Sequence, residues 1–383
     1  MPEGVYVHRI ALTAAANTCM FVFGVVLLLM GSLLPSLQVS NAQAGKLGSF
    51  PLMGILVATI LVGPILDTVG AKPALALALV LIAVPLAVIP SLHGYLGLAG
   101  AALTYGLGGG ALNTASNALV SDLNASGRAA ALNLLGFSLS LGAISTPLLM
   151  SIGDRLPSSL ALRLLATGVA VILLLVLVLR FPPAKRQGTP VSKLLRALNQ
   201  RPVWLFGVLL FFESGSENCM FVWSSKIVAD VLRTCPHRAN LALVALSGAH
   251  GIGRLIAALW LHGVCGRTVI RLSTAATVAG ALVVYSSREL PYVVAGMVVI
   301  GLGFSAIFPT ALGLAGDHFP GETGTLFGAL ITVAAVGGIV GPSAGSWLGG
   351  NGALRVLWIP VASATAIAAL TLRLRLTSAA VES

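Results

Sequence analysis

The sequence predicts an all-α membrane protein with twelve transmembrane helices, arranged as two parallel halves of six helices each. Composition is the first observation behind this prediction. Of 383 residues, 57% are hydrophobic and only 9% are charged, whereas a soluble domain carries about 25% charged residues. The chain cannot build a polar shell around a core of this size, so lipid must cover most of its surface. The second observation is an internal repeat that relates the first half of the chain to the second.

Twelve apolar stretches are long enough to cross a bilayer, which takes about 20 residues. They cover residues 11–36, 47–66, 73–91, 95–121, 128–151, 159–181, 202–229, 239–262, 267–286, 291–316, 323–349 and 353–372. Only one connection is long, the basic and proline-containing linker at 182–201. We therefore expect an N-terminal six-helix bundle at 1–181 and a C-terminal bundle at 202–383.

The formal net charge of +11 has two readings, nucleic-acid binding or membrane topology. Lys and Arg lie at the ends of the apolar stretches and in the loops, which favours topology. Most of them fall on the side of the N-terminus, where the linker at 182–201 adds several. Cytoplasmic loops are enriched in these residues, so both termini are expected in the cytoplasm, and the membrane is expected to be a bacterial inner membrane.

The internal repeat recurs at one offset. GLGGGALNTASNALVSD at 106–122 and GLGFSAIFPTALGLAGD at 301–317 are 195 positions apart, and the same offset relates GAISTP at 142–147 to GGIVGP at 337–342. Two parallel copies are related by an axis along the membrane normal. This organisation resembles that of major facilitator transporters, whose solute site lies between the halves.

The loop after the second apolar stretch resembles the major facilitator signature G-x-x-x-D-R-x-G-R-[RK]. The matching positions are Gly63, Asp67, Gly70 and Lys72, whereas Thr68 and Ala71 replace two basic residues. The resemblance implies that this loop latches the cytoplasmic side of the outward-facing state. The alternative is a cytoplasmic turn that carries one charge.

Residues 113–147 resemble helices 4 and 5 of the fucose–galactose–glucose:proton symporter family. That family shows E-T-x-x-N followed by L-N-L-x-x-x-F-x-x-x-G-A. Asn117, the run 132–134 and the pair 142–143 match these motifs. Further matches are Gly253-Arg254, Phe308-Pro309-Thr310 and Gly337-Gly338-Ile339-Val340. The resemblance implies alternating access, a hexose-like solute, proton coupling and a substrate-binding position at Phe308.

Two departures put the family's coupling sites in doubt. The first apolar stretch has no carboxylate, and Gly31 falls near the family's acidic position. Asn113 stands where the family has Glu. Any proton coupling is therefore expected to depend on another acid.

The seventh stretch supplies candidates in FFESGSENCMFVW. Glu213 and Glu217 are four residues apart and share one helix face. Ionisable groups inside a membrane are costly and mark functional sites. Two close carboxylates do not both ionise easily, so this pair is expected to exchange a proton, with Glu217 as the leading coupling residue. The alternative is permanent neutralisation by Arg254, near His250, whose Gly-Arg context also indicates a structural or gating role.

Amide side chains are the candidates for solute binding, because each offers both donors and acceptors to hydroxyl groups. Asn113 and Asn117 share a helix face, and Asn133 lies on the next helix. Asn218 and Trp223 follow the acids, the latter as a stacking surface for a sugar ring. The alternative for the amides is hydrogen bonding between helices.

The predicted function is secondary active transport of a small polar solute. A sugar is the leading candidate for the solute, and protons are the expected coupling ion. An organic-anion or drug transporter on the same fold is the main alternative, and a non-transporting membrane receptor is a further one. The sequence shows no nucleophile–base pair that would indicate an enzyme. The cysteines lack metal-ligand spacing: Cys19, Cys219, Cys235 and Cys265. We expect no cofactor, no metal and no nucleic-acid partner, and a monomer in the lipid bilayer.

Overall fold

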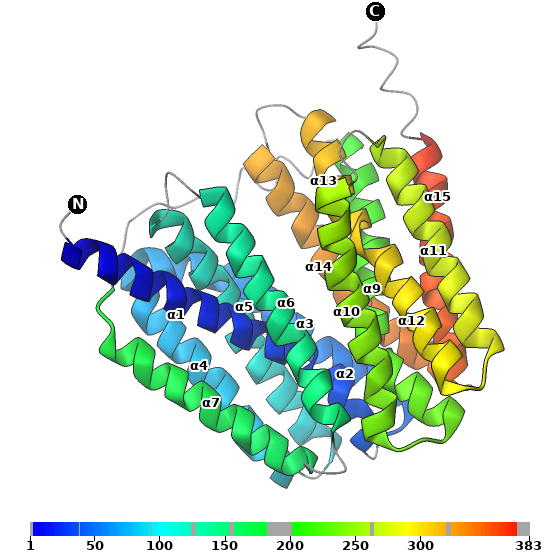
Figure 1. Ribbon diagram of the computed structural model, residues 1–383, viewed down its shortest axis with the longest axis horizontal. Coiled ribbons are helices and arrows are strands. Elements are labelled where there is room, and N and C mark those ends of the chain that lie inside the picture. Colours follow the sequence, from blue (N-terminus) through cyan, green and yellow to red (C-terminus); the bar gives the residue numbers. More distant parts are fainter. Residues whose placement is uncertain are drawn as a thin grey trace, which may run out of the picture. The chain divides into compact units, whose positions relative to one another are not determined.

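The computed structural model describes residues 3–37, 39–92, 94–123, 128–152, 157–181, 201–260, 264–318 and 323–373. Every regular element in these ranges is helical (Figure 1). The first half contains α1 (Glu3–Leu27), α2 (Leu29–Leu33), α3 (Asn41–Val69), α4 (Ala71–Val88), α5 (Tyr95–Leu123), α6 (Arg128–Ser151) and α7 (Ser158–Val178). Two short 3₁₀ helices, η1 (Leu34–Ser36) and η2 (Ile89–Ser91), follow α2 and α4.

The second half contains α9 (Arg201–Leu232), α10 (Pro236–Trp260), α11 (Gly266–Ser286), α12 (Leu290–Ser305), α13 (Ile307–His318), α14 (Thr323–Gly349), η3 (Ala353–Leu357) and α15 (Trp358–Arg373). Helices therefore occupy all twelve predicted spans. Within the described ranges, eleven segments are long and apolar enough to cross a membrane. The span formed by α5 is not among them, because its glycines, amides and hydroxyls lower its hydropathy.

Two of the spans are interrupted. The span formed by α12 and α13 is broken at Ala306. Pro309 explains this break, because it has no backbone N–H to donate to the Ser305 carbonyl oxygen. The first span breaks at Leu28, between α1 and α2. There the amide and the hydroxyl of Ser32 both donate to the Leu28 carbonyl oxygen, at 3.1 and 3.0 Å, and such back-bonding bends helices.

The chain forms two compact units. Unit 1 comprises residues 1–37 and 50–188, and unit 2 comprises residues 38–49 and 189–383. This division differs from the predicted bundles in residues 38–49, which include the first two turns of α3. The predicted linker lies outside the described residues, except for Arg201 at the start of α9.

The same glycine contacts recur in both units. In unit 1, a Cβ on Gly106 of α5 would overlap the carbonyl oxygen of Pro51 in α3. In unit 2, a Cβ on Gly301 of α12 would overlap the carbonyl oxygen of Leu246 in α10. Both residues of this contact are shifted by the predicted offset of 195 positions.

A second contact repeats at the same offset. A Cβ on Gly108 would lie 2.6 Å from the Ala78 carbonyl oxygen, and a Cβ on Gly303 would lie 2.8 Å from that of Ser273. The packing of α4 on α5 is thus reproduced by α11 on α12. Small residues allow membrane helices to approach closely, and the two copies use them at equivalent positions.

The beginning of α3 is held within unit 2. The Asn41 amide donates to the Gly349 carbonyl oxygen at 3.0 Å, and the Lys46 backbone N–H donates to Ser346 Oγ at 3.0 Å. The Ser49 hydroxyl donates to the Ile339 carbonyl oxygen at 2.7 Å. A Cβ on Gly45 would overlap the Pro342 carbonyl oxygen. These contacts fix residues 41–49 on α14.

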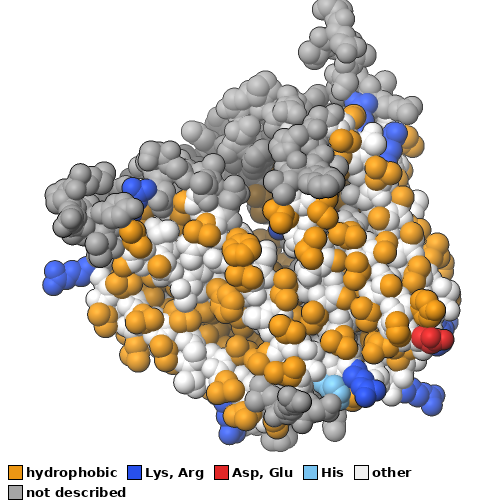
Figure 2. Space-filling model, in the orientation of Figure 1, with side chains coloured by type: hydrophobic (Ala, Val, Ile, Leu, Met, Phe, Trp, Pro, Cys, Tyr) orange, Lys and Arg blue, Asp and Glu red, His pale blue; other side chains and the backbone are white. Residues whose placement is uncertain are grey.

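On the face shown in Figure 2, hydrophobic side chains are spread over the described residues, and most Lys and Arg lie at the periphery. Leu174, Leu272 and Leu282 are 57% or more exposed. Such faces are stable in hydrocarbon and unstable in water. The chain is therefore a multi-pass membrane protein.

Candidate functional site

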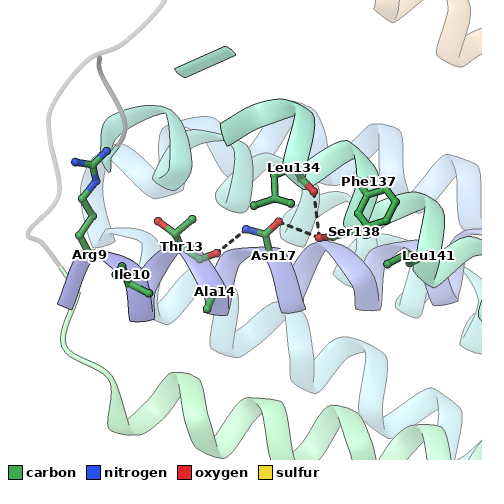
Figure 3. A pocket seen from close by; sticks show the side chains of 9 residues that line it. All are labelled: Arg9, Ile10, Thr13, Ala14, Asn17, Leu134, Phe137, Ser138 and Leu141. Carbon is green, nitrogen blue, oxygen red and sulfur yellow. Dashed lines mark hydrogen bonds between the residues drawn. The ribbon is translucent and has the colours of Figure 1, made fainter. Parts of the chain in front are cut away.

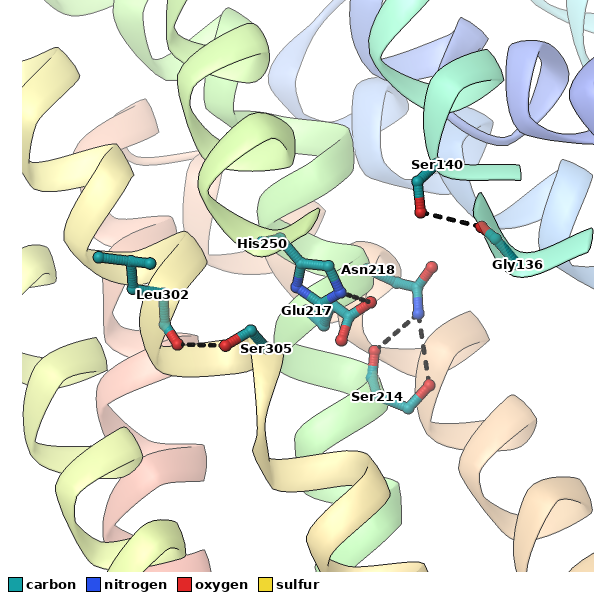
Figure 4. Close-up of polar contacts among 8 residues, drawn as sticks. All are labelled: Gly136, Ser140, Ser214, Glu217, Asn218, His250, Leu302 and Ser305. Carbon is teal, nitrogen blue, oxygen red and sulfur yellow. Dashed lines mark hydrogen bonds and ion pairs between the residues drawn. The ribbon is translucent and has the colours of Figure 1, made fainter. Parts of the chain in front are cut away.

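A polar face of α9 forms the first part of the site. Ser214, Glu217 and Asn218 lie along one side of this helix (Figure 4). The Asn218 amide donates to the Ser214 carbonyl oxygen at 2.9 Å and to its Oγ at 3.3 Å. The Asn218 carbonyl oxygen takes no part in these two bonds, and the side chain is half-buried. The face therefore presents an amide oxygen next to a carboxyl group.

Glu217 meets His250 of α10. The Glu217 Oε1 and His250 Nε2 atoms are 3.9 Å apart, with 15% and 10% of the two side chains exposed. The His250 ring packs edge-on against Phe221, with ring centroids 5.6 Å apart. His250 Nδ1 is enclosed and has no hydrogen-bond partner among the described residues. Carboxylate and imidazole thus form a nearly enclosed acid–base pair held by an aromatic ring.

Glu213 lies one turn before Glu217 and is fully buried. Neither of its carboxyl oxygens has a hydrogen-bond partner within the part of the chain that the structure describes. The two acids still act on each other electrostatically, and Arg254 acts on both. The structure thereby brings together the two predicted acids with His250 and Arg254.

Arg254 is exposed, although it lies within the predicted span of α10. It makes no ion pair of 4.0 Å or less with a described acid, so the alternative of a tight Glu–Arg pair is not what the structure contains. An Arg that faced hydrocarbon would be costly. Its guanidinium is instead a candidate to face water or a solute.

In unit 1, the two predicted amides of α5 bind each other. The Asn117 amide donates to the Asn113 backbone carbonyl oxygen at 2.8 Å and to its Oδ1 at 2.9 Å. Both side chains are half-buried. Asn133 lies on α6, but its side chain is outside the described residues. The amide pair keeps unused donors and acceptors for a ligand.

Two aromatic side chains that were predicted to contact the solute, Trp223 and Phe308, pack against other parts of the protein. Trp223 is fully buried, and its Nε1 donates to the Pro342 carbonyl oxygen at 3.2 Å. Its ring also lies against Gly345 and Gly349. Phe308 packs against the core of unit 2 around Phe206 and Ile307. The Trp223 ring therefore has no free face for stacking in this structure, whereas Phe308 is only partly buried and its predicted binding role stays a prediction.

The loop after α3 is described only in part. Gly63 and Asp67 lie outside the residues whose side chains are described. Gly70 has φ of 85°, a conformation that glycine adopts without strain. Lys72 Nζ donates to the Leu177 carbonyl oxygen at 2.6 Å and thus caps the C-terminal end of α7. The predicted gating role of this loop stays a prediction.

A pocket between α1 and α6 in unit 1 contains residues that were not predicted from the sequence (Figure 3). Its volume is about 560 Å³. The Ser138 hydroxyl donates to Asn17 Oδ1 at 2.9 Å, and the Asn17 amide donates to the Thr13 carbonyl oxygen at 2.8 Å. Arg9 lines one end, and Phe137, 60% exposed, lines the wall.

One feature of the sequence could have indicated this pocket, namely Asn17, a lone amide in an apolar stretch. Polar groups within a membrane favour protein- or water-facing positions. No periodic pattern connects Asn17 with Ser138, because these residues are 121 positions apart. Among the described residues, no three His, Cys, Asp or Glu side chains cluster as metal ligands.

Comparison with solved structures shows the fold. The chain is similar to a point mutant of the nucleoside transporter NupG, with a TM-score of 0.83, 14% identity and coverage of 96% of this chain and 100% of that one. It is similar to a bacterial homologue of the human lysosomal transporter Spinster, inward-facing and unoccupied, with a TM-score of 0.78, 12% identity and 97% of each chain covered. A D-xylose–proton symporter gives a TM-score of 0.74 and 15% identity, with 94% and 97% covered.

Sequence comparison agrees with the fold. An uncharacterized transporter, y4wD, from Sinorhizobium fredii (strain NBRC 101917 / NGR234) is 31% identical over 109 residues, which are 28% of this chain and 29% of that relative. The family model described as Major Facilitator Superfamily matches residues 12–232, more than half of the chain. The resemblance to the fucose–galactose–glucose branch is not tested by these matches. The chain belongs to the major facilitator superfamily.

Proposed function

We propose that this transporter moves a small, hydroxyl-bearing solute by proton-coupled alternating access. A sugar is the leading candidate for this solute. The pair of Glu217 and His250 carries the proposal. A carboxyl group and an imidazole 3.9 Å apart, both largely enclosed, form a place where a proton is taken up and released. We further propose a bacterial inner membrane as the location, cytoplasmic termini and a monomer.

Glu213 supports the same assignment. An ionised carboxylate that is buried without a partner is costly, so Glu213 is expected to hold a proton when Glu217 is charged. Two acids one helical turn apart then share protons instead of ionising together. In this proposal Glu217 couples transport to protons, and Glu213 limits the charge that the site holds.

The amides support a polar, uncharged solute. Asn218 and Ser214 lie next to Glu217, and the Asn113–Asn117 pair keeps unused hydrogen-bonding groups. Amides bind hydroxyl groups through both a donor and an acceptor. Two of the structurally similar proteins are a nucleoside transporter and a D-xylose–proton symporter, whose solutes carry several hydroxyl groups.

The coupling assignment is tested with Glu217→Gln in proteoliposomes. The amide keeps the size of the side chain but cannot exchange a proton. We expect accumulation of the solute against its gradient to be lost, while counterflow exchange of labelled for unlabelled solute remains measurable.

Asp230→Asn is the matched control on the same helix. Asp230 is paired with Lys226, 3.4 Å away, outside the Glu213–Glu217 cluster. The control should accumulate solute like the wild type. Accumulation by Glu217→Gln at the wild-type level would refute the coupling role.

Organic-anion transport is a second candidate, favoured by Arg254. Its side chain is exposed within a span and makes no ion pair with a described acid. A guanidinium in that position matches a carboxylate or phosphate. Loss of uptake of an anion, but not of a neutral sugar, in Arg254→Gln would select this candidate.

A further inference from the structure

A groove on the lateral surface of unit 2 lies between α11 and α15 and has a volume of about 500 Å³. Small side chains keep it open, namely Ala275 and Ala279 on α11 and Ala368 on α15. Leu272 and Leu282 on the same stretch of α11 are 65% and 57% exposed. The surface around the groove is therefore one that hydrocarbon covers, and the groove is open to lipid.

A positive charge closes one end of the groove. Arg271 lines it, and its Nη2 atom is out of contact with solvent and has no hydrogen-bond partner among the described residues. An enclosed donor that is left unpaired costs about 1–3 kcal/mol. Neither α11 nor α15 contains Asp or Glu, so neither helix supplies a carboxylate for this guanidinium. Arg271 as a whole is only half-buried, so its positive charge can attract an anion that lies in the groove.

The groove is long enough to hold one acyl chain. Arg271 and Leu282 mark its two ends along α11, and at about 1.5 Å per residue they are roughly 16 Å apart. Half of a hydrocarbon core is about 15 Å. Further along, Tyr285 and Trp358 pack with ring centroids 6.2 Å apart, and such aromatic rings mark a membrane interface. Arg271 thus lies toward one interface and the ring pair toward the other.

We propose that this groove binds an anionic phospholipid. Its phosphate accepts hydrogen bonds from the Arg271 guanidinium, which is suited to phosphate oxygens. One acyl chain lies along Ala275 and Ala279 and ends near Leu282. Because neither α11 nor α15 offers a carboxylate to the Arg271 charge, a net negative lipid is favoured over a zwitterionic one. In the predicted orientation this lipid belongs to the cytoplasmic leaflet.

The test is native mass spectrometry of the purified full chain with phosphatidylglycerol, phosphatidylcholine or glycerol phosphate. We expect the wild type to bind phosphatidylglycerol more strongly than phosphatidylcholine.

Arg271→Gln should weaken phosphatidylglycerol binding about fivefold, the effect of one basic residue near a membrane surface. Ala279→Leu should fill the groove and weaken both lipids. Ala275→Leu, also at an exposed position, is a second groove-filling variant if Ala279→Leu does not fold.

Arg288→Gln is the matched control. Arg288 follows α11 at the opposite end and donates to the carbonyl oxygens of Tyr285 and Ser287, so its loss should leave lipid binding unchanged. Wild-type phosphatidylglycerol binding by both Arg271→Gln and a groove-filling variant would overturn the proposal. Equal binding of the two lipids by the wild type, or full binding of glycerol phosphate alone, would also overturn it. These readouts do not depend on the proposed transport function.

Discussion

Glu213 is the residue whose surroundings are most at odds with its chemistry. It is fully buried, and within the described part of the chain nothing donates a hydrogen bond to its carboxyl oxygens. A buried carboxyl group without a hydrogen bond lowers the stability of the folded protein. A functional reason for it is therefore expected, and exchange of a proton with Glu217 is the one that its position favours.

Replacement of Glu213 by an apolar side chain of similar length separates stability from function. Glu213→Met should raise the free energy of unfolding by about 1–3 kcal/mol, because it removes a buried polar group without partners. The same variant should lose proton-driven accumulation. Thermal unfolding in detergent and uptake in proteoliposomes measure the two effects. A melting temperature below that of the wild type would show that the carboxyl group has a stabilising role.

Cys265 gives a second prediction at this scale, outside the membrane spans. The backbone N–H groups of Arg267 and Thr268 donate to its sulfur and lower the pKa of the thiol, because they stabilise the thiolate. The lowered pKa means that a larger fraction is thiolate at neutral pH, and that reactivity persists further as the pH falls. Cys265 should react with a maleimide faster than an unperturbed thiol at pH 7.

The sidedness of that reaction tests the predicted orientation. Cys265 lies on a loop that we place in the cytoplasm, so a membrane-impermeant maleimide should label it in inside-out vesicles only. Cys265→Ser is the control, since it leaves the half-exposed Cys235 on the opposite side. Labelling of Cys265 in right-side-out vesicles would contradict the orientation.

The sequence was enough to find the acids but not their surroundings. Spacing alone put Glu213 and Glu217 on one face, because both lie on one helix. The contact of Glu217 with His250 joins two helices, and the contact of Asn17 with Ser138 joins residues 121 positions apart. The burial of the Trp223 ring also depends on α14. Periodicity within a helix carries no information about such contacts.

At the level of helices, apolar length predicted nearly all of the boundaries. The predicted ranges 128–151 and 323–349 coincide with α6 and α14, because charged or glycine-containing loops flank both. The interruption at Ala306 follows from Pro309. The interruption at Leu28 involves no proline. It is associated with the Ser32 hydroxyl, which donates to the Leu28 carbonyl oxygen, and a serine in another rotamer fits an unbroken helix. The sequence therefore did not indicate that second break.

Glycine contacts fix how the helices pair. In unit 1 a Cβ on Gly142 would overlap the Phe21 carbonyl oxygen, and in unit 2 a Cβ on Gly337 would overlap that of Phe211. The pairing of α1 with α6 thus recurs in α9 with α14. Both contacts require a residue without a side chain, since backbone atoms cannot move aside as a flexible side chain does.

Gly337→Ala tests this packing. The added methyl group should separate α9 from α14 and destabilise the protein by about 1–3 kcal/mol, as overpacking does. Gly313→Ala is the matched control, because a Cβ on Gly313 in α13 meets nothing within 4 Å. The control should be neutral or stabilising by up to about 1 kcal/mol. Equal melting temperatures for Gly337→Ala and the wild type would contradict the close approach.

At the scale of the whole molecule, the same set of glycine contacts recurs in both units. The offset of 195 positions relates Gly106, Gly108 and Gly142 to Gly301, Gly303 and Gly337. The partners of the first two glycines follow the same offset, whereas Phe21 and Phe211 are 190 positions apart. The two halves thus differ by five residues between Phe21 and Pro51 and their counterparts Phe211 and Leu246, and both glycine contacts are kept.

The first two turns of α3 belong to unit 2, and the rest of this helix packs in unit 1, where Gly54 lies against α5. Pro51 follows directly after the change and leaves the Leu47 carbonyl without its usual helical donor. Under the proposed alternating-access mechanism, a change that involves α3 would have to bend this helix near Pro51 or break the hydrogen bonds that hold residues 41–49 on α14. Pro51 makes bending the cheaper of the two, because the helix already lacks one backbone hydrogen bond there.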